Sequence, residues 1–206
     1  MPEKGMLCCI TPEDGDPLAY AETVLSGGAD MIQLRRKNAS GRELCEWAVR
    51  LQGLCKRRGA LFIVNDRLDI ALASDADGVH LGQEDVPAAG ARTLLGKGKI
   101  LGVSTSSAEE AAQAVKDGAD YIGFGHVYPT PSKQKSSEPA GIARLKTVTA
   151  AIDVPVIAIG GITEENIDDV TAAGAYGIAV ISAVSGAADP VSAVRRLRQG
   201  INPAHS

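Results

Sequence analysis

Short, largely apolar runs alternate with longer segments of helical period along the whole chain, and this alternation limits the folds open to it. The runs are continuous rather than alternating in polarity, which is typical of parallel strands covered by helices on both faces. Eight runs are predicted to be strands: Met6–Ile10, Met31–Leu34, Leu61–Val64, Gly78–Leu81, Ile100–Val103, Tyr121–Phe124, Val156–Ile159 and Gly177–Ile181.

The segments between the runs carry helix signals, with Ser, Thr or Asp at the predicted starts. Four helices are predicted with their preceding residues: Arg42–Arg57 after Ser40, Ala108–Lys116 after Ser107, Glu164–Ala173 after Thr163, and Pro190–Arg198 after Asp189. A Gly-Ala-Asp-like triplet recurs where a helix should end and a strand begin, at residues 28–30, 75–77, 118–120 and 174–176. Glycine is favoured at such helix ends because it adopts the left-handed conformation.

Repetition of a strand–helix unit eight times in 206 residues predicts one closed (β/α)8 TIM barrel, and an open doubly wound sheet is the alternative. No linker divides the chain, so a single domain is expected over residues 1–206, with the last few residues a flexible tail. Aromatic residues make up only 3% of the chain, so Ala, Val, Ile and Leu must form the core.

Composition also excludes several classes of function. A net charge of −4 argues against a nucleic-acid-binding face, and no apolar run is long enough to span a membrane. The four cysteines lack C-x-x-C spacing, which indicates reduced, mostly buried thiols and a cytoplasmic location. The expected partners are small molecules, and the sequence leaves self-association open.

Active sites of such barrels lie at the carboxyl ends of the strands, where this chain carries cations, carboxylates and glycines. Gly160-Gly161 follows the seventh run and is predicted to open a helix and bind a phosphate, with Ser182 after the eighth run as a second contact. The alternative is that the glycine pair only makes a tight turn. Arg35, Lys37 and Lys133 are the cations expected to hold phosphate oxygens, although Lys133 alone could equally be a solvated loop lysine.

Asp66 and Asp85 follow neighbouring runs and admit two interpretations of equal weight. Two carboxylates at adjacent strand ends suit Mg²⁺, which shares its coordination with water and substrate phosphates. Aspartate is also a common helix N-cap. Arg36 should point away from Arg35 and be structural or exposed.

The three histidines differ in expected role. His80 lies inside a run and should satisfy a core hydrogen bond or line the barrel, whereas His205 lies in the tail. His126 opens the long irregular stretch His126–Ala140 and should face the site, either as an acid–base group or as a phosphate contact.

An ordered set of motifs along nearly the whole chain resembles the thiamine-phosphate synthase family. These motifs are Gln33-Leu34-Arg35-Arg36-Lys37, Val64-Asn65-Asp66, Asp77-Gly78-Val79-His80-Leu81-Gly82-Gln83-Glu84-Asp85, Leu101-Gly102-Val103-Ser104, Tyr128-Pro129-Thr130-Pro131-Ser132-Lys133, Ile159-Gly160-Gly161-Ile162 and Val180-Ile181-Ser182. The resemblance implies a TIM barrel that joins a pyrimidine pyrophosphate ester to a thiazole phosphate and releases pyrophosphate.

By position, the resemblance implies that Asp66 and Asp85 bind Mg²⁺. It places the pyrimidine pyrophosphate on Gln33, Arg35, Lys37, Asn65, Ser104 and Lys133, among which Arg35, Lys37, Ser104 and Lys133 are the expected catalytic residues. It places the thiazole phosphate and its surroundings on Thr130, Ser132, Gly161, Ile181 and Ser182, and we add His80, His126 and Gly160 as further substrate contacts. The family's common acidic residue after the motif arginine is Arg36 here, a peripheral difference that we expect to be tolerated.

Two rival functions stay open. The segment around His126 is similar to the related thiazole tautomerase, in which a histidine at this position takes part in proton transfer. That relative tends to lose the metal carboxylates, which this chain keeps, so the synthase is favoured. The third possibility is a non-catalytic barrel that binds thiazole phosphate or thiamine phosphate as a regulator.

Overall fold

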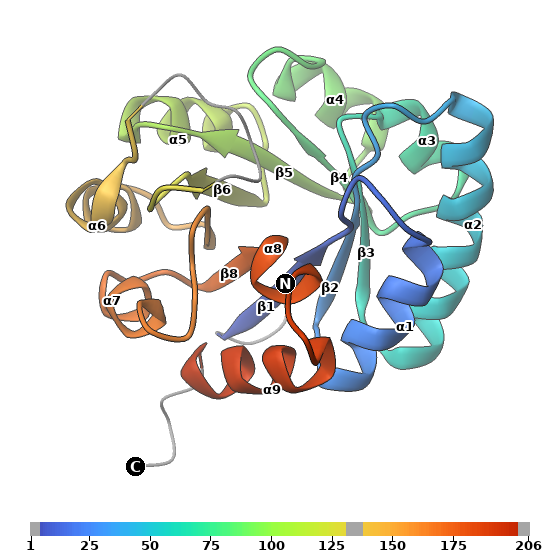
Figure 1. Cartoon of the computed structure of the whole chain (residues 1–206). Coiled ribbons are helices and arrows are strands. Elements are labelled where there is room, and N and C mark those ends of the chain that lie inside the picture. Colours follow the sequence, from blue (N-terminus) through green and yellow to red (C-terminus); the bar gives the residue numbers. More distant parts are fainter. Residues whose placement is uncertain (1–4, 131–137, 202–206) are drawn as a thin grey trace.

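Figure 1 shows a ring of strands enclosed by helices in the computed structural model, which describes residues 5–130 and 138–201. Within these ranges eight parallel strands follow one another around the sheet, and pairing of the first with the last closes the barrel. The predicted (β/α)8 barrel is confirmed and the open sheet is excluded. The strands are β1 (Met6–Ile10), β2 (Met31–Leu34), β3 (Leu61–Asn65), β4 (Gly78–Leu81), β5 (Ile100–Thr105), β6 (Tyr121–Gly125), β7 (Val156–Ile159) and β8 (Gly177–Val180).

Helices connect and cover the strands. They are α1 (Pro17–Gly27), α2 (Gly41–Arg58), α3 (Leu68–Ala73), α4 (Ala88–Leu95), α5 (Ala108–Lys116), α6 (Gly141–Ala151), α7 (Ile167–Ala172), α8 (Ser182–Ser185) and α9 (Pro190–Ile201). Ser40 caps α2 as predicted, since its hydroxyl accepts a hydrogen bond from the Glu43 N–H while the Glu43 carboxylate accepts from the Ser40 N–H. No helix among the described residues has the length and hydrophobicity needed to cross a bilayer.

The core has two layers, and strand β1 shows how one strand serves both. Leu7 and Cys9 belong to the cluster between strands and helices, whereas Met6, Cys8 and Ile10 belong to a smaller cluster inside the barrel. Because successive side chains of a strand point to opposite faces, a strand buried on both sides is apolar throughout. The other buried members of the inner cluster are Met31, Ile63, Tyr121, Ile157 and Ala179.

The recurring triplet has a structural reason at the amino-terminal rim. Its aspartate comes just before a strand and accepts a hydrogen bond from the backbone N–H of the preceding strand. Asp30 binds the N–H of Leu7 at 2.9 Å, Asp77 that of Phe62 at 2.7 Å, and Asp120 that of Leu101 at 2.7 Å. The fourth triplet ends in Tyr176, whose carbonyl accepts from the Gly5 N–H instead. The repeat therefore stabilises the rim opposite the predicted site.

We expect Asp77→Ala to destabilise the protein without slowing its chemistry. The substitution leaves the buried Phe62 N–H without its 2.7 Å acceptor, which should cost about 1–3 kcal/mol. Thermal denaturation should show a melting temperature several degrees lower, while activity per folded molecule stays unchanged. The exposed Asp153 offers a matched control, since Asp153→Ala also removes one carboxylate. A loss of activity at 20 °C in Asp77→Ala alone would contradict this assignment of the two rims.

Several predicted boundaries are wrong. Strands β3, β5 and β6 continue past the apolar runs to Asn65, Thr105 and Gly125, because polar and glycine positions still pair with neighbouring strands. Strand β8 stops at Val180, one residue earlier than predicted.

Two further predictions concern the long loop and the chain ends. The described parts of the predicted loop, residues 126–130 and 138–140, contain no helix or strand, as expected. The predictions for Ser132 and Lys133, and for the tail with His205, fall outside the residues that the structure describes.

Candidate functional site

A cavity of about 430 Å³ opens at the carboxyl ends of the strands. Its apolar floor comes from the inner cluster, including Cys8, Ile10 and Ile157. Most of the predicted site residues line it: Gln33, Arg35, Asn65, His80, Ser104, His126, Thr130, Gly160, Gly161, Ile181 and Ser182. Lys37, Asp66 and Asp85 are not among the lining residues. Asp66 nevertheless lies near Asp85, Lys37 and Arg35, and Arg35 lines the cavity.

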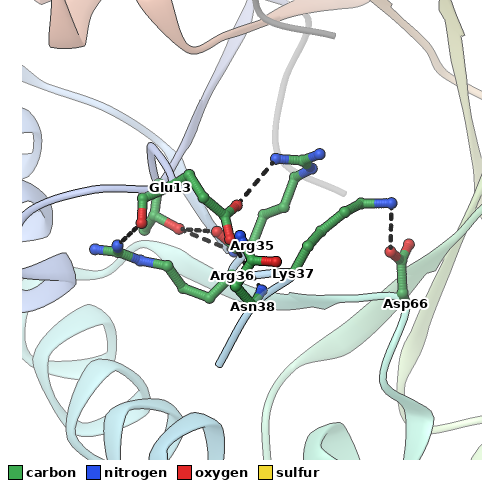
Figure 2. A network of polar contacts seen from close by, with 7 residues as sticks. Glu13, Arg35, Arg36, Lys37, Asn38 and Asp66 are labelled. Carbon is green, nitrogen blue, oxygen red and sulfur yellow. Dashed lines mark hydrogen bonds and ion pairs between the residues drawn. The ribbon is translucent and has the colours of Figure 1, made fainter. Parts of the chain in front are cut away.

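Asp66 and Asp85 lie against each other at the ends of β3 and β4. Burial and the contact with Asp85 raise the pKa of Asp66, and the nearby Lys37 and Arg35 offset only part of that rise. Figure 2 shows the Lys37 side chain directed at the Asp66 carboxylate, and the Lys37 Nζ lies 3.6 Å from Asp66 Oδ2. The protein thus holds two carboxylates close together, and its nearby cations, Lys37 and Arg35, only partly offset the cost of ionising Asp66.

The helix-cap interpretation of these aspartates is wrong. Helix α3 is preceded by Arg67 and helix α4 by Pro87, and neither helix start has a side-chain cap. Asp66 instead has a left-handed backbone (φ 61°), and its N–H donates to the His80 carbonyl at 2.8 Å. Asp85 accepts a hydrogen bond from the Gly82 N–H at 2.6 Å. Both carboxylates are oriented by the strand ends rather than by helices.

The carboxylate pair fits a Mg²⁺ ion better than a metal held by protein alone. Among residues 5–130 and 138–201 no three His, Cys, Asp or Glu side chains form a metal-binding group. Magnesium commonly takes one or two carboxylates and completes its shell with water and substrate phosphates. Hard oxygen donors that repel each other without a cation are the appropriate ligands for such an ion.

A buried polar chain crosses the cavity floor and includes one residue that sequence reasoning missed. His80 Nδ1 lies 2.8 Å from the Tyr121 hydroxyl and His80 Nε2 lies 2.8 Å from the Ser104 hydroxyl, while Tyr121 also hydrogen-bonds Gln33. Burial raises the pKa of Tyr121 well above its usual range, so its hydroxyl stays neutral. The prediction that His80 satisfies a core hydrogen bond or lines the barrel is confirmed in both parts.

Glycines on two strands make room for this chain. A Cβ on Gly123 would lie 2.7 Å from His80 Cε1, and one on Gly102 would overlap the Tyr121 ring. Two glycines inside otherwise apolar strands, next to a tyrosine at a strand start, were the available signal for Tyr121.

The glycine loop after β7 does not open a helix, contrary to the prediction. Gly160 and Gly161 have positive φ values of 97° and 66°, and α7 begins only at Ile167. The side chain of Asn166 closes this loop by two hydrogen bonds to its backbone, where a helix was expected to begin. Its Oδ1 accepts from the Thr163 N–H at 2.9 Å, and its Nδ2 donates to the Gly161 carbonyl at 3.0 Å. A loop closed in this way still presents backbone at the cavity, where Ser182 faces it from the end of β8.

His126 lines the same wall of the cavity. The chain after it pairs with the glycine loop, since the Val127 N–H donates to the Ile159 carbonyl at 2.9 Å and the Tyr128 N–H donates to the Gly160 carbonyl at 3.0 Å. Residues 126–128 and the glycine loop therefore form one continuous, hydrogen-bonded wall of the cavity.

A closed (β/α)8 barrel with a glycine loop after β7, a carboxylate pair and cations at one mouth is typical of barrel enzymes that act on phosphorylated substrates. The thiamine monophosphate synthase family model matches residues 7–184, and the chain belongs to that family.

Named relatives agree with this family assignment. A thiamine-phosphate synthase of Chlorobium luteolum is 56% identical over 98% of this chain and 95% of its own length. One of Chlorobium limicola is 55% identical over 96% and 94%. Among solved structures, a thiamine phosphate pyrophosphorylase from Pyrococcus furiosus is 41% identical, covers 99% of this chain and 98% of its own, and superimposes with a TM-score of 0.89.

Proposed function

We propose that this chain is a thiamine-phosphate synthase, a transferase that joins 4-amino-5-hydroxymethyl-2-methylpyrimidine pyrophosphate to a thiazole phosphate and releases pyrophosphate. The observation that carries the proposal is one cavity lined by Arg35 on one side and by the glycine loop with Ser182 on the other, with Lys37 and the paired carboxylates next to the Arg35 side. Two anionic substrates need two such sites, facing each other across a common space.

The proposed chemistry is a dissociative substitution at the pyrimidine methylene carbon. The C–O bond to pyrophosphate breaks, the amino-pyrimidine ring stabilises the cation, and the thiazole nitrogen then forms the new C–N bond. Arg35, Lys37 and Asn65, with Lys133, would hold the departing pyrophosphate. Ser104 and Gln33 would hold the pyrimidine ring, while Thr130, Ser132, Gly161 and Ser182, with Ile181, would hold the thiazole phosphate.

A Mg²⁺ ion on Asp66 and Asp85 would supply positive charge to the leaving pyrophosphate. The residues around the cavity contribute in other ways. Ile10, Ile157 and Cys8 form an apolar floor that would exclude water from the reacting carbon. Burial raises the pKa of Cys8 to about 12, so this thiol stays protonated and no thiolate competes for the cation. All four cysteines are free, which supports a reducing, cytoplasmic location.

Mixing both substrates with the protein and Mg²⁺ tests the proposal directly. Pyrophosphate and thiamine phosphate should appear in equal amounts, and chelation of the metal should stop both. Binding of both ligands without any product at any Mg²⁺ concentration would refute the synthase and favour the regulatory barrel.

The lining position of His126 keeps the tautomerase as a second candidate. Because the proposed substitution needs no strong base, His126→Gln should lower kcat/KM for the thiazole by no more than about fivefold. Steady-state kinetics with varied thiazole phosphate provide the measurement. Metal-independent isomerisation of a carboxylated thiazole phosphate that disappears in His126→Gln would instead support the tautomerase.

A further inference from the structure

The loop between β1 and α1 contacts the predicted pyrophosphate residue Arg35, yet none of its residues takes part in the proposed reaction. Glu13 lies in this loop and uses its two carboxylate oxygens differently. Oε1 accepts a hydrogen bond from the Asn38 N–H at 3.0 Å, while Oε2 lies 3.5 Å from Arg35 Nη1. Figure 2 shows the Glu13 carboxylate between the Arg35 side chain and the backbone that follows it.

Arg36 fixes the same loop from the opposite side. Its two terminal nitrogens donate to the carbonyls of Glu13 and Gly15, and its guanidinium lies over the Trp47 ring, 5.5 Å from the centroid. Arg36 points away from Arg35 and is structural, in agreement with the prediction (Figure 2). The position of Glu13 is therefore fixed at two points. Arg36 binds its backbone carbonyl, and the Asn38 N–H binds one of its carboxylate oxygens.

The loop also holds Arg35 by its backbone. The Thr11 hydroxyl is fully buried, accepts from the Arg35 N–H at 2.9 Å and donates to the Arg35 carbonyl at 3.0 Å. Arg35 is thus held at its main chain by Thr11 and at its guanidinium by Glu13.

A carboxylate beside a pyrophosphate site has two opposite effects. Its charge repels the anion, but its contact with Arg35 restricts a long side chain that would otherwise sample many rotamers. Arg35 and Glu13 are 18% and 32% exposed, and ion pairs this accessible to solvent contribute little to folding stability. Because Glu13 is fixed in place, we expect its main effect to be orientation of the Arg35 guanidinium rather than stabilisation of the fold.

We propose that Glu13 is a positioning residue that holds the Arg35 guanidinium in the orientation in which it binds the pyrophosphate oxygens of the pyrimidine substrate. This proposal rests on the proposed function. A guanidinium grips a phosphate through two parallel hydrogen bonds, so its angle matters as well as its charge.

Glu13→Gln separates the two effects because it removes the charge and keeps the shape and an acceptor for the Asn38 N–H. If positioning dominates, kcat/KM for the pyrimidine pyrophosphate should fall about tenfold, and inorganic pyrophosphate with Mg²⁺ should bind more weakly. The KM for the thiazole phosphate should change less than twofold. If Glu13 acts only through its charge, pyrophosphate should bind more tightly, and that result would overturn the proposal.

A double-mutant cycle distinguishes positioning from general damage to the loop. In an Arg35→Lys background, Glu13→Gln should change kcat/KM for the pyrimidine pyrophosphate less than twofold, since the guanidinium that Glu13 orients is already absent. Equal effects in both backgrounds would overturn the proposal. The matched control is Asp75→Asn, which removes the exposed Asp75–Lys99 pair (2.7 Å) at the opposite rim and should change none of these values.

Calorimetric binding of inorganic pyrophosphate with Mg²⁺ keeps the test independent of turnover. If the unmodified protein releases no pyrophosphate from the two substrates, the proposed function fails, and the binding comparison still decides the role of Glu13. Weaker pyrophosphate binding by Glu13→Gln then supports the positioning role, and equal or tighter binding refutes it.

Discussion

Asp85→Asn is expected to lower turnover about a thousandfold while leaving the fold intact. The asparagine oxygen can still accept from the Gly82 N–H, which Asp85 binds at 2.6 Å, so the loop after β4 should keep its conformation. The charge that would help to hold Mg²⁺ against the leaving pyrophosphate is lost, and such electrostatic assistance is worth several kcal/mol. Turnover at saturating substrates over a range of Mg²⁺ concentrations is the measurement.

The same substitution should not reduce stability when Mg²⁺ is absent. Asp66 and Asp85 contact each other, and the raised pKa of Asp66 means that its ionised form is disfavoured in the folded protein. Burial is the larger cause of this shift and is unchanged in the variant, whereas neutralising Asp85 removes the part that its charge contributes, so the metal-free melting temperature should stay the same or rise by a degree or two. Added Mg²⁺ and pyrophosphate should raise the melting temperature of the unmodified protein only.

Asp77→Ala supplies the opposite pattern, with lower stability and full activity, because Asp77 supports the amino-terminal rim. A variant at Asp85 that loses stability and activity together would indicate a structural carboxylate and would remove the basis for the metal site.

The barrel itself was predictable because each unit of its pattern is local. Continuous apolar runs, helix caps such as Ser40 and Ser107, and the recurring glycines are short-range signals that agree with one another. The general position of the site followed from closure, since the carboxyl ends of all strands then meet at one mouth.

Structural features that depend on contacts between residues far apart in the sequence could not be predicted from the sequence. The Thr11–Arg35 hydrogen bonds join residues 24 positions apart, and the His80–Tyr121 bond joins residues 41 apart. The predicted start of α7 is wrong because the Thr163 N–H donates to the Asn166 side chain. The prediction had this part of the chain begin a helix instead. The predicted strand ends are wrong for a similar reason. Asn65 belongs to β3 because its backbone pairs with His80 of β4, although its polar side chain indicated the end of the strand.

Gly161→Ala is expected to raise the KM for the thiazole phosphate by one to two orders of magnitude. The added Cβ would lie 2.7 Å from Tyr128 Cβ and against the Pro129 carbonyl, and the backbone there has a φ of 66°. These neighbours cannot retreat without breaking the 3.0 Å hydrogen bond from the Tyr128 N–H to the Gly160 carbonyl, so the glycine loop itself must move. The KM for the pyrimidine pyrophosphate should change less than threefold, because that substrate is assigned to β2–β4.

Gly59→Ala separates this steric effect from backbone strain. Gly59 ends α2 with nearly the same φ, 68°, but no atom lies within 4 Å of its added Cβ. Both variants should lose about 1–2 kcal/mol of stability from the left-handed backbone, and only Gly161→Ala should weaken thiazole phosphate binding. Equal changes in both KM values for Gly161→Ala would point to distortion of the whole mouth. An unchanged thiazole phosphate KM would place that phosphate elsewhere, since a backbone cradle cannot bind its anion once a methyl group has displaced it.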